Sequence, residues 1–103
     1  MYKICVYVPE KHVETVKQAL FDAGAGRIGN YDSCCWQTEG TGQFRPLQNS
    51  NPAIGSLNQV EQVREIKIEL VCEDDLVKQA VQAMRKNHPY EEPAFDVWQL
   101  AEF

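Results

Sequence analysis

Apolar and polar side chains alternate along two stretches of the chain, a pattern typical of β-strands that bury one face. In residues 2–8, aliphatic side chains occupy every second position from Ile4 onward. Residues 63–71 repeat the pattern, with Lys67 and Glu69 between aliphatic neighbours. We therefore expect a strand at each of these places.

Two further strands are predicted from composition. Residues 31–38 are aromatic, small and compatible with a strand, and residues 40–42 (Gly-Thr-Gly) form a turn signal after them. Residues 95–100 are apolar and aromatic and predict the last strand. The strand at residues 31–38 is followed by residues 40–59, which lead to the strand at residues 63–71 and are rich in Gly, Pro, Asn and Ser. A connection this long is usually functional. We interpret it as a protruding loop that responds to a ligand.

Helical spacing of apolar residues predicts two helices. The first carries apolar residues at helical intervals from Val13 to Ala23, and Gly24 is expected to end it. The second follows the acidic residues 73–75, which suit a helix start, and ends near Asn87.

The predicted order is strand, helix, strand, long loop, strand, helix, strand, and its two halves look alike, since residues 16–20 resemble residues 77–81. Such a duplication predicts an α+β fold: a ferredoxin-like βαββαβ sandwich, one domain over residues 1–103, with a four-stranded antiparallel sheet and both helices on one face. The other face, with Tyr7, Trp36 and Trp98 on or near it, is expected to be covered by another subunit, giving a homo-oligomer.

Bulk composition narrows the function. The 103 residues fit a single domain, and 15 acidic against 10 basic residues give a net charge of −5, which disfavours nucleic acid as a partner. No apolar run is long enough to span a membrane, and no secretory signal is recognised at the start. We expect a cytoplasmic protein with four reduced cysteines.

The densest chemical cluster lies between two prolines, in residues 88–93. His88, Tyr90, Glu91 and Glu92 supply an imidazole, a phenol and two carboxylates, which suit a divalent ion or a polar ligand. The alternative is that the prolines only shape the connection into the last strand, while the histidine and tyrosine pack locally.

Two other motifs each have two interpretations. Phe44 and Arg45 could clamp a planar anionic ligand, or the ring could pin the loop while the guanidinium is solvated. Residues 24–29 match the dinucleotide pattern G-x-G-x-x-G, but these glycines follow a helix instead of opening one, so we interpret them as a turn.

Four separated stretches closely resemble the central insert domain of the YqfO family, the NGG-one-interacting-factor-three-like proteins. They are residues 24–31, 40–46, 51–55 and 88–96, in the order in which the family carries them. The His88–Glu91 segment is also similar to the CutA divalent-ion-tolerance proteins. The likeness runs over the whole chain and resembles the insert as a stand-alone form.

The resemblance implies a PII/CutA-like fold that tends to trimerise through its sheets, with the 40–59 loop where PII proteins carry their effector loop. It does not imply an enzyme, because the two-metal domain of larger family members has no counterpart among these residues, and only His12 and His88 could supply histidine ligands here.

The expected function is therefore non-enzymatic binding of a small ligand, or regulation, with the loop contacting a partner protein. The ligand-binding residues predicted are Phe44, Arg45, His88, Tyr90, Glu91 and Glu92. The alternative is CutA-like binding of copper or zinc, for which the predicted ligands are His88, Glu91, Glu92 and Cys34.

Overall fold

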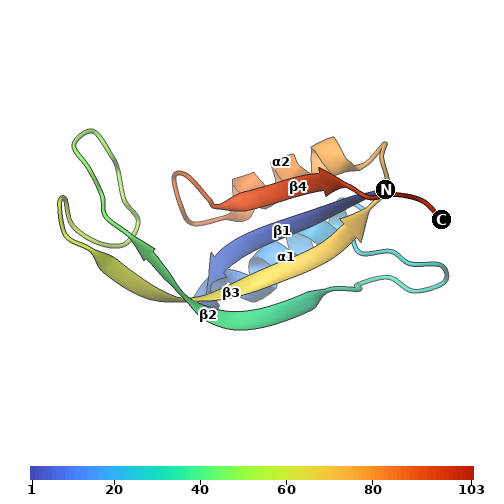
Figure 1. Cartoon of the computed structure of the whole chain (residues 1–103), viewed down its shortest axis with the longest axis horizontal. Coiled ribbons are helices and arrows are strands. Elements are labelled where there is room, and N and C mark those ends of the chain that lie inside the picture. Colours follow the sequence, from blue (N-terminus) through green and yellow to red (C-terminus); the bar gives the residue numbers. More distant parts are fainter.

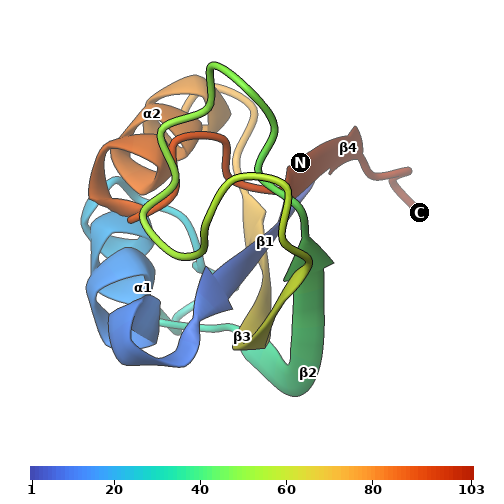
Figure 2. The same cartoon turned by 90° about the vertical axis from the view of Figure 1, so that its left-hand side faces the viewer.

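The computed structural model describes all 103 residues and forms two layers, a sheet and a pair of helices (Figure 1). In chain order the elements are β1 (Tyr2–Pro9), a 3₁₀ turn (Glu10–His12), α1 (Val13–Asp22), β2 (Trp36–Phe44), β3 (Glu61–Cys72), α2 (Val77–Asn87) and β4 (Phe95–Gln99). All neighbouring strands are antiparallel, in the order β2-β3-β1-β4. The end-on view in Figure 2 shows both helices on the same face of the sheet. The predicted ferredoxin-like fold is confirmed.

The core lies between the sheet and the helices. The alternation seen in the sequence points the aliphatic side chains of β1 and β3 toward α1 and α2, where Val16, Leu20 and Met84 are fully buried. Helical spacing brings the apolar residues of each helix onto one face, and burying them is the main force that holds the helices on the sheet. The strand residues of this core are Ile4, Val6, Val8, Ile66, Ile68, Leu70 and Cys72.

The second strand differs from the prediction. It starts at Trp36 and continues to Phe44, so Gly40 and Gly42 lie within β2 and do not form a turn. The reason is tertiary: β3 is 12 residues long, and its residues 61–69 pair with all of β2, including Gly40 opposite Glu65. The long loop consequently covers residues 45–60, five residues later at its start than expected.

The glycines after α1 form a turn, as predicted. Gly24 and Gly26 have φ values of 102° and 80°, a left-handed backbone that favours glycine at the end of a helix. The Gly26 amide donates a hydrogen bond of 2.8 Å to the Val71 carbonyl of β3, so this turn leads back to the sheet.

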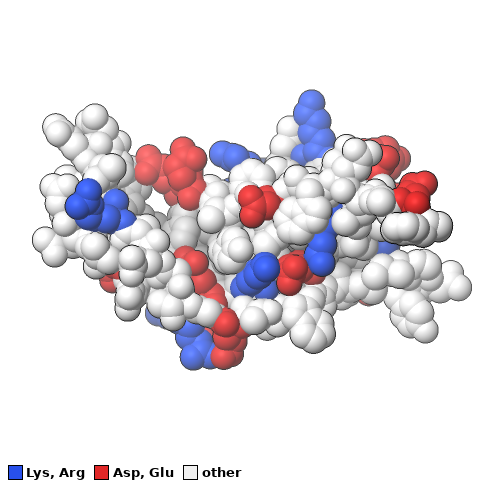
Figure 3. Space-filling model, viewed as in Figure 1, with Lys and Arg blue, Asp and Glu red and all other residues white.

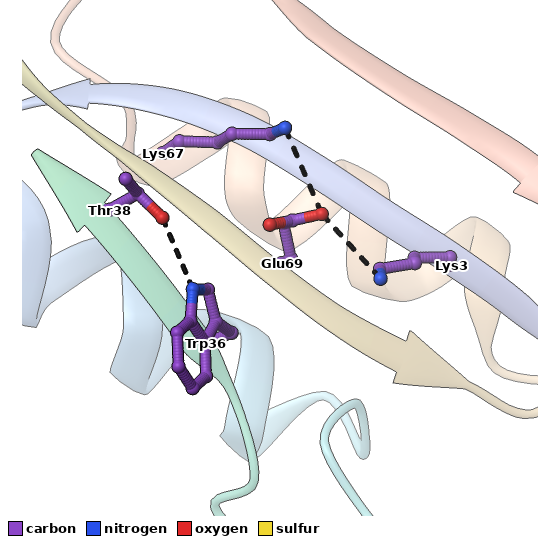
Figure 4. Close-up of polar contacts among 5 residues, drawn as sticks. All are labelled: Lys3, Trp36, Thr38, Lys67 and Glu69. Atoms are coloured by element: carbon purple, nitrogen blue, oxygen red, sulfur yellow. Dashed lines mark hydrogen bonds and ion pairs between the residues drawn. The ribbon is translucent and has the colours of Figure 1, made fainter. Parts of the chain in front are cut away.

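The sheet face away from the helices is open. Trp36 is 69% exposed and Trp98 is 43% exposed, and the face also carries polar groups (Figure 4). Lys3 and Lys67 both lie near Glu69 Oε1, at 3.5 and 3.8 Å. Elsewhere in the molecule, none of the helices combines the length and apolar character that a membrane crossing requires.

Candidate functional site

A cavity of about 420 Å³ lies at one end of the sheet, between the 45–60 loop and the segment that joins α2 to β4. In Figure 1 both connections lie toward the same end of the sheet. Figure 3 shows a recess between the loop and the body of the molecule, with acidic side chains above and below it. The lining residues are Tyr7, Gln43, Phe44, Arg45, Pro46, Leu47, Ser50, Pro52, Ala53, Ile54, Glu65, Tyr90, Glu91, Glu92 and Ala94.

Tyr90 is the central polar side chain of this cavity. Its hydroxyl donates a hydrogen bond of 2.9 Å to Glu65 Oε2 on β3. The ring meets the edge of Phe44, with 5.7 Å between the centroids. Burial, followed by the contact with the Glu65 carboxylate, raises the pKa of Tyr90 well above its usual value. The phenol therefore stays protonated and joins the α2–β4 connection to the β2–β3 ribbon.

Gly42 creates the space for this contact. A β-carbon at that position would collide with the Glu65 carboxylate, whereas one at Gly40 would meet nothing within 4 Å. Glycine inside a strand often marks a close approach of this kind. The residue interpreted from the sequence as part of a turn thus lets Glu65 lie across β2.

His88 lies behind Tyr90 and is 7% exposed. The Tyr90 amide donates a hydrogen bond of 3.1 Å to His88 Nδ1, so Nδ1 carries no proton. Nε2, 2.7 Å from the Tyr7 carbonyl oxygen, must then be the protonated nitrogen that donates to it. Burial lowers the pKa of His88, which agrees with a neutral imidazole. Both ring nitrogens are therefore engaged in holding the segment onto β1.

The loop is fastened at two points. The backbone N–H of Asn51 donates a hydrogen bond of 3.0 Å to Glu91 Oε2, which ties the loop to the opposite wall of the cavity. At the base of the loop, the backbone N–H of Asn58 donates a hydrogen bond of 2.7 Å to the Pro46 carbonyl. The cavity walls are thus held by contacts between residues about forty positions apart in the sequence as well as by local ones.

The structure brings most of the predicted ligand-binding residues together. Phe44, Arg45, Tyr90, Glu91 and Glu92 all line the cavity, while His88 supports it from behind.

Cys34 lies apart from the other three predicted metal ligands. Its amide donates to the Gly26 carbonyl, in the connection at the opposite end of the sheet. No three His, Cys, Asp or Glu side chains anywhere in the chain come close enough together to hold a metal ion.

Sequence reasoning missed Glu65 and Tyr7, which also line the cavity. Glu65 occurs in a regular strand pattern, in which an outward polar residue is unremarkable, and Tyr7 is predicted only for the open sheet face. A signal did exist in Gly42, since a glycine assigned to a strand suggests that another group approaches the backbone there.

The arrangement suits the binding of a small molecule. Apolar side chains of the loop and the rings of Phe44, Tyr7 and Tyr90 offer contact area, and a few polar groups converge on the space. Pockets with this composition and a volume in the range of roughly 300 to 1,000 Å³ are typical of small-molecule sites.

No protein-family model matches the chain, but curated relatives match nearly all of it. A protein of Halalkalibacterium halodurans described as a GTP cyclohydrolase 1 type 2 homolog is 46% identical over 98% of the chain. A protein of the same description from Mycobacterium tuberculosis is 47% identical over 95% of it. The chain spans only about a quarter of these relatives, 27% and 26% of their lengths.

Solved structures support the same assignment. A Bacillus cereus protein related to NIF3 superposes with a TM-score of 0.83 and 42% identity, covering 98% of this chain and 26% of its own. CutA1 from Pyrococcus horikoshii superposes with a TM-score of 0.71 over all of this chain and 86% of its own, at 16% identity, which shows a shared fold. By sequence and fold, the chain matches the domain that makes up about a quarter of these longer NIF3-related relatives, so the predicted resemblance to the insert domain of the YqfO family is confirmed, and that domain has the fold of CutA1.

Proposed function

We propose that this domain is a non-enzymatic module that binds a small ligand and assembles with copies of itself. The observation that carries the proposal is the cavity, because it joins the long loop to the Tyr90–Glu65 pair on the sheet. The name GTP cyclohydrolase 1 type 2 homolog describes relatives about four times as long, and we do not extend a catalytic activity to this domain.

A ligand in the cavity would contact the loop at its start and near its middle. Phe44 and Arg45 stand at the loop's start, and Asn51 already connects its middle to Glu91. The loop exposes Leu47, Leu57 and Val60, apolar side chains that a partner protein could contact. A ligand that fixes the loop would therefore alter the surface offered to the partner.

The open sheet face is the proposed contact between subunits, with a trimer as the expected assembly. Its exposed Trp36 and Trp98 are large aromatic groups of the kind that subunit interfaces bury. Tyr7 lies on this face and also lines the cavity, so a neighbouring subunit would stand near the mouth of the site. Assembly and ligand binding would then influence each other.

Hydrogen exchange tests the ligand-dependent loop. Amides of residues 45–60 should exchange more slowly when the protein is screened against mixtures of metabolites and one component binds, while amides of residues 26–34 should not change. If no mixture slows the loop amides, the proposal of a ligand-dependent loop fails.

Analytical ultracentrifugation over a range of concentrations checks self-assembly. A monomer at the highest concentration would exclude the proposed homo-oligomer.

A second proposal is CutA-like binding of copper or zinc. It is favoured by the shared fold and by the His88–Glu91 segment, and a structural neighbour from Archaeoglobus fulgidus is described as a divalent cation tolerance protein. Against it, His88 uses both ring nitrogens for hydrogen bonds. Calorimetry with Cu²⁺ and Zn²⁺ decides: tight binding that is lost in His88→Ala supports the metal function, and unchanged weak binding excludes it.

A further inference from the structure

The charges that line the cavity define the class of ligand more narrowly than the fold does. Three carboxylates, those of Glu65, Glu91 and Glu92, face the space together with a single guanidinium, that of Arg45. None of the four forms an ion pair within the protein, although six ion pairs exist elsewhere on its surface. The cavity therefore carries an excess of uncompensated negative charge.

Existing hydrogen bonds satisfy only part of these carboxylates. Glu65 accepts the Tyr90 hydroxyl through Oε2, and Glu91 accepts the Asn51 amide through Oε2. Glu92 has no hydrogen-bond partner in the protein. An ionised carboxylate can only accept hydrogen bonds, so the remaining oxygens, which are open to solvent in Glu91 and Glu92, are available to donors from a ligand.

The aromatic side chains favour the same charge. Tyr7, Phe44 and Tyr90 present rings to the cavity, and ring faces carry a negative quadrupole that attracts cations. The protein as a whole has a net charge of −5, so its long-range field also draws cations and repels anions. An anionic ligand would have to approach against both effects.

We infer that the cavity takes a small organic cation: an amine or a guanidine attached to an apolar or aromatic body. The cationic group lies among the carboxylates and rings, and the body packs against the apolar side of the loop, which includes Leu47, Pro52 and Ile54. This is the opposite charge to the planar anion suggested by Phe44 and Arg45 alone. The inference rests on the proposed function, since it names the ligand class of the same cavity.

Two probes with the same phenyl body and opposite charge test the inference. Phenethylamine carries an ammonium group and 3-phenylpropionate carries a carboxylate, and each is titrated into the ¹⁵N-labelled protein at low ionic strength. Amides of the cavity, such as those of Leu47, Ala53 and Glu91, should shift in a saturable way with the amine. The amine should bind about tenfold more tightly than the acid, and salt should weaken it.

Two matched variants test whether the charge at the cavity itself controls the binding of phenethylamine. Glu92→Gln removes an exposed carboxylate at the cavity and should weaken phenethylamine binding about fivefold, the effect of one charge at contact distance in water. Glu102→Gln removes the same charge outside the cavity and should change the affinity much less. Equal effects of the two variants would overturn the inference.

The remaining outcomes separate the two proposals. Saturable cavity shifts with 3-phenylpropionate and none with phenethylamine would overturn the cation inference and leave the small-ligand function standing. Shifts with neither probe, in a protein that also fails the metabolite screen, would overturn both. Stronger binding of the amine, reduced in Glu92→Gln, supports both.

Discussion

The two ends of the sheet each carry a connection with a conspicuous sequence motif, but only one of these connections helps to form a cavity. The motifs are the glycine-rich residues 24–29, which the sequence predicts as a turn, and the proline-framed residues 88–93, which it predicts as a candidate site. At the first end, the connection folds back on itself through the Ile28–Tyr31 bridge and leaves Tyr31 75% exposed. At the other, distant residues meet and enclose a cavity.

The difference lies in long-range contacts. At the cavity end, His88 reaches Tyr7, Tyr90 reaches Glu65 and Glu91 reaches the loop. The first end has the backbone bond from Gly26 to β3 but no comparable set of side-chain bonds from other elements. A motif therefore becomes a site only where the fold supplies partners, and substitutions of residues that differ in this respect should differ in their effects.

The largest difference in the free energy of unfolding is expected between substitutions of the two histidines, one buried and one exposed. His88→Ala should lower the free energy of unfolding by about 2 to 4 kcal/mol, because it leaves the Tyr7 carbonyl without its donor and opens a void. His12→Ala, at an exposed position, should change it by less than about 0.5 kcal/mol. Urea denaturation followed by tryptophan fluorescence measures both. Equal losses would show that burial of His88 does not matter.

A smaller effect should separate two glycines of the same strand. Gly42→Ala pushes the Glu65 carboxylate away from Tyr90 and should cost about 1 to 2 kcal/mol. Gly40→Ala meets nothing and should be neutral or slightly stabilising, since it restricts the unfolded chain. Thermal unfolding gives the comparison, and the same loss in both variants would contradict the role assigned to Gly42.

Tyr90 and Tyr31 form the next pair. Tyr90→Phe removes the hydrogen bond to Glu65 and should cost about 1 kcal/mol, while Tyr31→Phe should have almost no effect. Ultraviolet titration adds a second readout, because the most alkaline phenol transition should vanish only in Tyr90→Phe. If that transition persists in Tyr90→Phe, the pKa shift is misassigned.

The smallest effect concerns pH. Burial lowers the pKa of His88 below its ordinary value of 6.5, so the unfolded chain binds a proton that the folded chain resists. The stability that the neutral ring contributes should be complete above that value and decline as the pH falls below it. His88→Gln should flatten this part of the profile of unfolding free energy against pH. An unchanged slope in the variant would assign the effect to other groups.

Sequence reasoning predicted the element order and the sheet, because alternating and helical patterns in residues such as Ile66, Ile68 and Leu70 report directly on a buried face. It placed β2 too early, since the pairing that keeps Gly40 and Gly42 in a strand depends on the length of β3. Strand ends are set by the neighbouring strand, and the local sequence carries little of that information.

Only part of the cavity lining could be selected from the sequence, because the rest depends on contacts between distant residues. Phe44, Arg45 and the residues around Tyr90 are unusual locally and could be selected from the chain. Glu65 could not, because it becomes part of the site only through its bond to a tyrosine 25 positions away. The support given by His88 was also hidden, since its partner is a backbone carbonyl on β1.

Ligand mapping by nuclear magnetic resonance shows directly whether the cavity binds small molecules. A library of small charged and neutral fragments is screened against the ¹⁵N-labelled protein, and the amides that move are placed on the structure. Saturable shifts are expected at Phe44, Asn51 and Tyr90, with residues 28–32 unchanged. Shifts concentrated at residues 28–32, or none at the cavity, would show that the cavity is not the binding site.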